Sequence, residues 1–281
     1  MSNKLSKFKS CEIELFSYCN RTCWFCPNSF VDRRSKKEHL SESVYISILK
    51  ELRENGFGAD WQGGEISYSR YNEPLSDDIF FERVSQAKEI LPNTLLRTNT
   101  NGDYLSPKII ERAETSGLGL LNIQLYPVGE YSIKEIKRLY KQKTKKLGIE
   151  TKLVEPRSPD WSDYRGRIKW EGQFGKMKVW MLGRDFSSNG VDRGGSIDSL
   201  TKGFRTSPCS YPSKGIYIDW NGNVMPCCNL RSDIKEHESY ILGNVNTQSL
   251  VSCLTNNHAC SFREEMKKHG EKTGACKTCL F

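Results

Sequence analysis

Three closely spaced cysteines, Cys19, Cys23 and Cys26, are the residues whose types and spacing most clearly indicate chemistry. They lie within eight residues, and the chain has 11 cysteines but only 4 histidines, so we expect thiolates to hold any bound metal. A structural zinc site takes four ligands, and no fourth stands at zinc-finger spacing here. A four-iron cluster held by three thiolates keeps one iron open for a substrate or cofactor. The spacing therefore predicts a catalytic iron–sulfur cluster.

A second group of cysteines lies near the end of the sequence and consists of Cys209, Cys227, Cys276 and Cys279. Clustered cysteines in a reducing compartment indicate metal binding rather than disulfide bonds. Four thiolates suit either a second [4Fe–4S] cluster or a zinc ion, and the sequence alone leaves both open. We favour the iron–sulfur cluster because the first group already indicates one.

Four further cysteines are weaker signals. We expect Cys11, Cys253 and Cys260 to be buried as small apolar side chains. Cys228 adjoins a predicted ligand and has three interpretations: a packed thiol, a ligand in place of Cys227, or a catalytic donor of a hydrogen atom to a substrate radical.

Short β-rich runs alternate with amphipathic helices between the two cysteine groups. The predicted strands are Glu12–Phe16, Ile66–Arg70, Leu95–Thr98, Leu121–Tyr126, Glu150–Val154 and Lys178–Leu182. The predicted helices run from Ser41 to Asn55, over about Asp77–Leu91, from Ser106 to Gly117, and over about Ser132–Lys146. Serine at a helix start and glycine at its end are typical cap residues. The alternation predicts an α/β protein with parallel strands and helical crossovers.

The composition changes after about residue 195, where Cys, Asn, Gly and Ser become more frequent. Two β-rich runs, Gly215–Trp220 and Asn223–Met225, flank Asn221-Gly222, and this pattern predicts a β-hairpin. We therefore expect a first domain over residues 1–195 and a smaller second domain over residues 196–281.

The first cysteine group also carries a resemblance to a known family. The Cys-x3-Cys-x2-Cys spacing, with Phe25 before Cys26 in a loop after the first strand, resembles the radical S-adenosylmethionine superfamily. The phrase from Cys19 to Ser29 is most similar to its 2-deoxy-scyllo-inosamine dehydrogenase-like members. The resemblance implies a partial (β/α)6 barrel, whose open iron chelates the amino and carboxylate groups of S-adenosylmethionine. It also implies one-electron cleavage of that cofactor to a 5′-deoxyadenosyl radical.

The family has a Gly-Gly-Glu-Pro-like turn after its second strand, which holds the methionine amino group. Gly63-Gly64-Glu65 matches in letters but precedes the predicted strand Ile66–Arg70. Ligand loops in parallel α/β folds follow the carboxyl ends of strands. Tyr71-Asn72-Glu73-Pro74 stands at that place, so we predict that Asn72 and Glu73 bind the cofactor, with Glu73 facing its ammonium group.

Other cofactor contacts are implied by the same resemblance. Thr100 and Asn101 follow the third predicted strand and resemble the family's Thr-Asn-Gly turn, although a simple polar turn explains them equally well. Gln124 on the fourth strand is placed to reach the ribose, or is a buried structural amide. Phe25 completes the predicted cofactor site.

The C-terminal cysteines resemble a SPASM domain, a cysteine-rich extension that holds auxiliary clusters. The sequence lacks the further cysteines of a full SPASM domain after Cys279, and the shortened pattern resembles the twitch type with one auxiliary [4Fe–4S] cluster. We therefore predict two [4Fe–4S] clusters and S-adenosylmethionine as cofactors.

Arg193 is the residue that we expect to contact substrate. It lies between Asp192 and Gly194-Gly195 after the sixth predicted strand, and its guanidinium suits hydroxyl, carboxylate or phosphate groups. The phrase is similar to the Asn-Arg-Gly-Gly of the inosamine dehydrogenase-like members, where the arginine contacts substrate. A plain surface turn is the alternative.

The predicted cluster ligands, cofactor contacts and substrate arginine together favour an enzyme that oxidises a small polar metabolite such as a sugar or aminocyclitol. The first alternative is a radical enzyme that modifies a ribosomally made peptide by epimerisation, cross-linking or oxidation. About ten residues precede the first predicted strand, so we expect a leader-binding domain to be absent or separate, which favours the small molecule. A distant alternative is a non-catalytic zinc protein that binds nucleic acid.

Charge and hydropathy limit the partners and the location. The net charge of +8 suits an anionic partner. The sequence has no groove-binding motif, however, so we do not expect nucleic acid as a partner. No apolar run approaches the ~18 residues of a membrane span, and the lysine-rich start has no apolar stretch behind it. We therefore expect a cytoplasmic enzyme, supplied with electrons by a reductant such as flavodoxin or ferredoxin.

Overall fold

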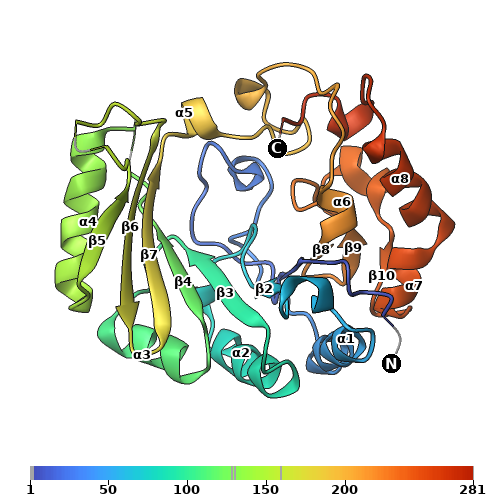
Figure 1. The fold of residues 1–281 in the computed structure, drawn as a ribbon, viewed down its shortest axis with the longest axis horizontal. Coiled ribbons are helices and arrows are strands. Elements are labelled where there is room, and N and C mark those ends of the chain that lie inside the picture. Colours follow the sequence, from blue (N-terminus) through green and yellow to red (C-terminus); the bar gives the residue numbers. More distant parts are fainter. Residues whose placement is uncertain (1–2, 128, 130, 159, 281) are drawn as a thin grey trace.

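The computed structural model describes residues 3–127, 129, 131–158 and 160–280. Its centre is a curved ten-stranded sheet with the order β10-β9-β8-β1-β2-β3-β4-β7-β6-β5. Figure 1 shows helices α1 to α4 along the outside of this sheet and the β1–α1 loop on its inner side. The described residues contain no helix that is long and apolar enough to cross a membrane.

Six neighbouring strands of the sheet are parallel and form the partial barrel. In spatial order they are β8 (Gly215–Ile218), β1 (Ser10–Ile13), β2 (Glu65–Ser67), β3 (Leu95–Thr100), β4 (Leu120–Gln124) and β7 (Met177–Arg184). Their buried residues are mostly apolar, as expected for strands covered on both faces. The carboxyl ends of all six lie at one rim, where the loops that carry the predicted site begin.

The four predicted helices of the barrel are present: α1 (Glu42–Glu54), α2 (Ile79–Ile90), α3 (Pro107–Thr115) and α4 (Ile133–Leu147). Ser41, Ser106 and Ser132 cap α1, α3 and α4, because each side chain accepts a hydrogen bond from a backbone N–H of the first turn. The apolar faces of these helices pack on the sheet in one continuous core.

The structure corrects one of the predicted barrel strands. The run predicted at Glu150–Val154 forms β5 (Thr151–Glu155), which is antiparallel and lies at the edge of the sheet. It pairs with β6 (Arg167–Phe174), a strand that the sequence analysis missed, and β6 returns into β7 through the turn Gly175-Lys176. Gly175 has a φ of +55°, so this two-residue turn was a readable hairpin signal.

The predicted C-terminal hairpin is confirmed, and it completes the barrel. β8 and β9 (Asn223–Met225) are antiparallel, while β8 also pairs in parallel with β1, Ser10 opposite Gly215. β8 thus takes the sixth parallel position that the prediction gave to Glu150–Val154. The other short elements are α5 (Phe186–Asn189), α6 (Tyr211–Lys214), β10 (Gly243–Asn244), α7 (Leu250–Thr255) and α8 (Asn257–Lys267).

Candidate active site

A cavity of about 340 Å³ lies at the carboxyl ends of the parallel strands. Cys19, Cys23 and Cys26 line one side of it, on the loop between β1 and α1. The loop is folded by its own backbone, because Cys26 N–H donates to the Cys23 carbonyl and Cys19 N–H to the Arg33 carbonyl, each at 2.9 Å. The structure therefore brings the three predicted ligands to one cavity wall.

The surroundings of these thiols suit a cationic cofactor. Burial, followed by smaller effects that include the charges of the neighbouring cysteines, raises the pKa of Cys19 to about 12 and that of Cys23 to about 11. Three thiolates this close repel one another unless a positive core lies between them. In the described part of the chain, no three His, Cys, Asp or Glu side chains converge as they would on a single metal ion. What supports an iron–sulfur cluster is the donor type, since three cysteine thiols line the same cavity.

Glu73, the predicted ammonium partner, lies in the same cavity and is held by the other predicted cofactor residues. Its carboxylate accepts hydrogen bonds from the Thr100 hydroxyl (2.6 Å), Asn101 N–H (2.8 Å) and Leu75 N–H (3.2 Å). Burial raises the pKa of Glu73 to about 7. Gly102 closes the turn with a φ of +75°, which favours glycine. Two separate predictions, the turn after β2 and the turn after β3, thus form one hydrogen-bonded unit.

Glu65, the alternative glutamate, is at the other end of its strand. It opens β2 and lies 3.4 Å from the Arg97 guanidinium, and it is not among the residues that line the cavity. Asn72 and Gln124 do line it. The side chain of Asn72 donates back to the Tyr68 carbonyl at 3.3 Å, so it also shapes its own turn.

Aromatic side chains separate this cavity from a second one. Phe25 stacks on Phe186, with ring centroids 3.5 Å apart and planes inclined by 3°, and its centroid is 5.1 Å from that of Tyr126. The second cavity, of about 750 Å³, lies across this wall and is also lined by Trp24 and Tyr131. The sequence analysis found Phe25 but missed Phe186, which follows β7 directly.

The four C-terminal cysteines are also neighbours. Burial, followed by the charges of Cys279 and Cys209, raises the pKa of Cys276 to about 12. A hydrogen bond with the Cys228 thiol and burial raise the pKa of Cys227, and the charge of Cys279 adds to this effect, so Cys227 lies near the same group. Asn229 joins them, because its backbone N–H donates to Cys227 Sγ at 3.4 Å and its amide to Cys279 Sγ at 3.7 Å.

Cys228 lies in a small apolar cluster and is 1% exposed. It does not line the cavity, and its carbonyl oxygen, rather than its thiol, accepts hydrogen bonds from Arg70 and Tyr71. This position favours packing over hydrogen-atom donation. The burial of Cys11 and Cys253 is confirmed, whereas the prediction for Cys260 was wrong, because its place on α8 leaves it exposed.

Arg193 lines the cavity, as predicted, together with Arg21, Arg97 and two further arginines, none of which the sequence analysis singled out. Its guanidinium donates to Asn229 Oδ1 at 3.0 Å, and its backbone has a φ of +54°, which is rare for a residue other than glycine. Arg70 and Arg184 are the other two. Arg70 ends the predicted second strand and Arg184 ends β7. Glu73 was found by the rule that ligand-binding residues follow the carboxyl ends of parallel strands, and this rule also applies to these two arginines.

A buried group of charges lies beneath the cavity and was not predicted. Glu14 follows β1 and accepts hydrogen bonds from the backbone N–H groups of Tyr71 and Asn72, the turn that leads to Glu73. The Arg33 guanidinium lies 3.1 Å from Glu14 and 3.0 Å from Asp233. The available signal was Glu14 itself, a charged residue inside an apolar predicted strand.

Comparison with known proteins agrees with this arrangement. Residues 209–280 match the model of the SPASM family, described as an iron–sulfur cluster-binding domain. The structure of anSMEcpe with bound AdoMet has the same fold, with a TM-score of 0.55 and 14% identity over 92% of this chain and 84% of that one. The chain thus has the fold of proteins solved with bound AdoMet, and its C-terminal segment matches an iron–sulfur cluster-binding domain.

Two further relatives are similar along nearly the whole chain. The S-adenosyl-L-methionine-dependent 2-deoxy-scyllo-inosamine dehydrogenase of Niallia circulans is 27% identical over 278 residues, which are 97% of this chain and 92% of that protein. The crystal structure of BtrN in complex with AdoMet and 2-DOIA has a TM-score of 0.69 and 23% identity, over 98% of this chain and 93% of that one.

The iron content tests both thiol groups. We predict about eight irons per chain after anaerobic reconstitution, four for each cluster. Changing Cys19, Cys23 and Cys26 together to Ala should remove about half of this iron. Cys227→Ala should lower the iron content of the second group, whereas Cys228→Ala, the matched control, should leave it unchanged. A full iron content in the triple variant would contradict the assignment.

Removal of the buried cation tests the charges beneath the cavity. Arg33→Met leaves the buried Asp219 without its ion pair and removes one of the two arginines beside Asp233, so we expect the free energy of unfolding to fall by about 3–5 kcal/mol, measured by urea denaturation of the reconstituted protein. Arg138→Met is the control, because Arg138 forms an exposed pair with Glu135 on α4, and we expect it to leave the free energy of unfolding nearly unchanged. Equal losses would show that the buried group adds no stability.

Proposed function

We propose that this chain is a radical S-adenosylmethionine dehydrogenase, which oxidises a carbinol carbon of a small polar metabolite of the sugar or aminocyclitol type. The observation that carries the proposal is one cavity lined by three thiols, by the Glu73 unit and by Arg193. Its volume of about 340 Å³ lies in the range of cavities that bind a small molecule. The dehydrogenase relative, similar along nearly the whole chain, supports the reaction type.

We assign the residues as follows. Cys19, Cys23 and Cys26 would hold the first [4Fe–4S] cluster, and Cys209, Cys227, Cys276 and Cys279 the second. When bound, the two clusters supply the electron that cleaves S-adenosylmethionine and accept the electron that the substrate releases. An external reductant such as flavodoxin or ferredoxin would deliver the first electron.

The protein residues position the reactants. Glu73, fixed by Thr100 and Asn101, would accept hydrogen bonds from the amino group of S-adenosylmethionine. Phe25 and Gln124 would contact its nucleoside part from opposite walls of the cavity. Arg193 would hold the substrate hydroxyl, and its guanidinium stays protonated while that oxygen loses its proton. The substrate thus loses a hydrogen atom to the 5′-deoxyadenosyl radical, then a proton and an electron, which leaves a carbonyl.

A second candidate function is the modification of a peptide. The aromatic cavity of about 750 Å³ beside the first one supports it, because Trp24, Tyr131 and Phe186 offer apolar surface to a side chain of a longer substrate. Epimerisation, cross-linking and oxidation of a peptide all remain within this proposal.

Glu73→Ala should weaken binding of S-adenosylmethionine, because the variant lacks the charged acceptor for its amino group. A hydrogen bond to a charged group contributes roughly 1.5–3 kcal/mol, so we expect the Kd to rise about 10- to 100-fold in isothermal titration calorimetry. Glu65→Ala is the control and should bind with nearly the wild-type Kd. If Glu65→Ala weakens binding more than Glu73→Ala, the glutamate has been misassigned.

Isotope transfer tests the reaction itself. With dithionite, the enzyme should release 5′-deoxyadenosine, and a substrate deuterated at the reacting carbon should transfer deuterium into it. Mass spectrometry should show a product two hydrogens lighter than the substrate and one S-adenosylmethionine consumed per product. A product of unchanged mass that gains deuterium from solvent, and fails to do so in Cys228→Ala, would exclude oxidation and indicate an epimerase.

A further inference from the structure

The cavity carries more positive charge than the chain itself neutralises. Five arginines line it. Two have carboxylate partners: Arg21 lies 2.5 Å from Asp103 and Arg97 lies 3.4 Å from Glu65. The other three, Arg70, Arg184 and Arg193, form no ion pair with any residue that the structure describes.

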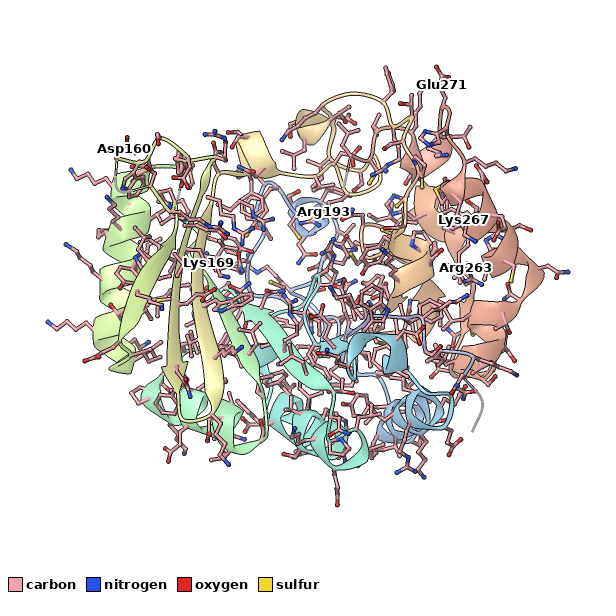
Figure 2. All side chains as sticks on the ribbon, viewed as in Figure 1. Asp160, Lys169, Arg193, Arg263, Lys267 and Glu271 are labelled. Carbon is pink, nitrogen blue, oxygen red and sulfur yellow. The ribbon has the colours of Figure 1, made fainter. Side chains whose placement is uncertain are left out.

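The three unpaired arginines come from different elements and meet at one side of the cavity. Arg70 and Arg193 both donate to Asn229 Oδ1, at 2.5 and 3.0 Å, so a single neutral oxygen lies between two guanidinium groups. Figure 2 shows Arg193 near the middle of the molecule, between the β7 side of the sheet and the C-terminal segment. The Nε of Arg193 is buried and has no hydrogen-bond partner.

Arg184 reaches the cavity from the end of β7 and has no hydrogen bond to any described residue. Its guanidinium carbon lies 5.8 Å from the centroid of the Phe186 ring. Burial and the positive charges of neighbours, Arg167 first and then Arg193, lower the pKa of Arg184. Partly buried cations of this kind are normally paired.

Thiolate-bound clusters explain only part of this charge. Arg70 and Arg193 adjoin Asn229, which contacts Cys227 and Cys279, so a negative cluster at the second thiol group would attract both. No hydrogen bond joins Arg184 to a thiol of either group among the residues that the structure describes. S-adenosylmethionine brings one carboxylate, which the family resemblance assigns to the open iron. A further anion is therefore needed beside Arg184 and Arg193.

We propose that Arg184 and Arg193, with Arg70 behind them, bind an oxyanion on the substrate, either a carboxylate or a phosphate. A guanidinium donates two parallel N–H groups to such an anion, and a cavity lined by one sign of charge concentrates ligands of the other sign. This inference rests on the proposed function and narrows it: the substrate is an acidic or phosphorylated polyol rather than a neutral or cationic one.

Binding to the loaded enzyme tests the proposal without turnover. Holoenzyme with both clusters, saturated with S-adenosylmethionine and kept free of reductant, is titrated anaerobically with myo-inositol 1-phosphate, glucuronate and myo-inositol. We expect one of the two anions to bind at least tenfold more tightly than myo-inositol, and the tighter anion identifies phosphate or carboxylate. Arg184→Gln and Arg193→Gln should each weaken that binding at least tenfold. Arg53→Gln, which removes an exposed charge from α1, should not.

Three results would overturn the proposal: equal affinity for the anions and for myo-inositol, unchanged anion binding in Arg184→Gln, or a shifted reduction potential of the second cluster with unchanged anion binding. The last result would make the arginines counter-charges of the cluster. Release of 5′-deoxyadenosine with dithionite is measured on the same preparations. Its absence would contradict the proposed function, whereas anion binding that depends on Arg184 would still support the oxyanion site.

Discussion

The Arg33 guanidinium holds together the parts of this protein from which the cavity is built. It follows the cysteine loop, is 3% exposed, and reaches Glu14 at the end of β1, Asp219 after β8 and Asp233 in the C-terminal segment. Burial raises the pKa of Glu14 to about 8, so near neutral pH this carboxyl group is largely protonated. The two positive charges of Arg33 and the neighbouring Arg231 then balance the two negative charges of Asp219 and Asp233. Charges buried at this depth are tolerated only when they are balanced and hydrogen-bonded.

The geometry of the cofactor turn depends on the same group. Glu14 accepts hydrogen bonds from the backbone of Tyr71 and Asn72, and the next residue is Glu73. Arg231 donates to Asn28, whose amide in turn donates to the Tyr71 carbonyl, each at 2.8 Å. The turn after β2 is thus fixed from the β1 side and from the C-terminal side. These hydrogen bonds limit the movement of the turn, whereas Arg33 Nη2 has no hydrogen-bond partner among the described residues and only the 3.5 Å ion pair with Asp219.

The sequence predicted local features well and long-range pairing poorly. Cysteine spacing and the position of Tyr71-Asn72-Glu73-Pro74 after a strand located the cavity wall, because both signals are contained in a few residues. Serine caps and glycine ends located the helices for the same reason. The partner of β8 could not be read, since alternation of apolar residues shows that a run is a strand but not which strand it joins. Arg70 and Arg184 could have been predicted in the same way as Glu73, because Arg70 ends the predicted second strand and Arg184 ends β7.

The pairing of β8 with β1 has a consequence for how the chain is made. Ser10 and Gly215 are opposite one another, so a strand from the start of synthesis waits for a strand made some two hundred residues later. Until then one edge of β1 has open backbone groups, and exposed edges of this kind promote aggregation. Contacts so distant in sequence also slow folding. The barrel therefore closes only after β8 has been synthesised, and the last members of the second thiol group, Cys276 and Cys279, are synthesised later still.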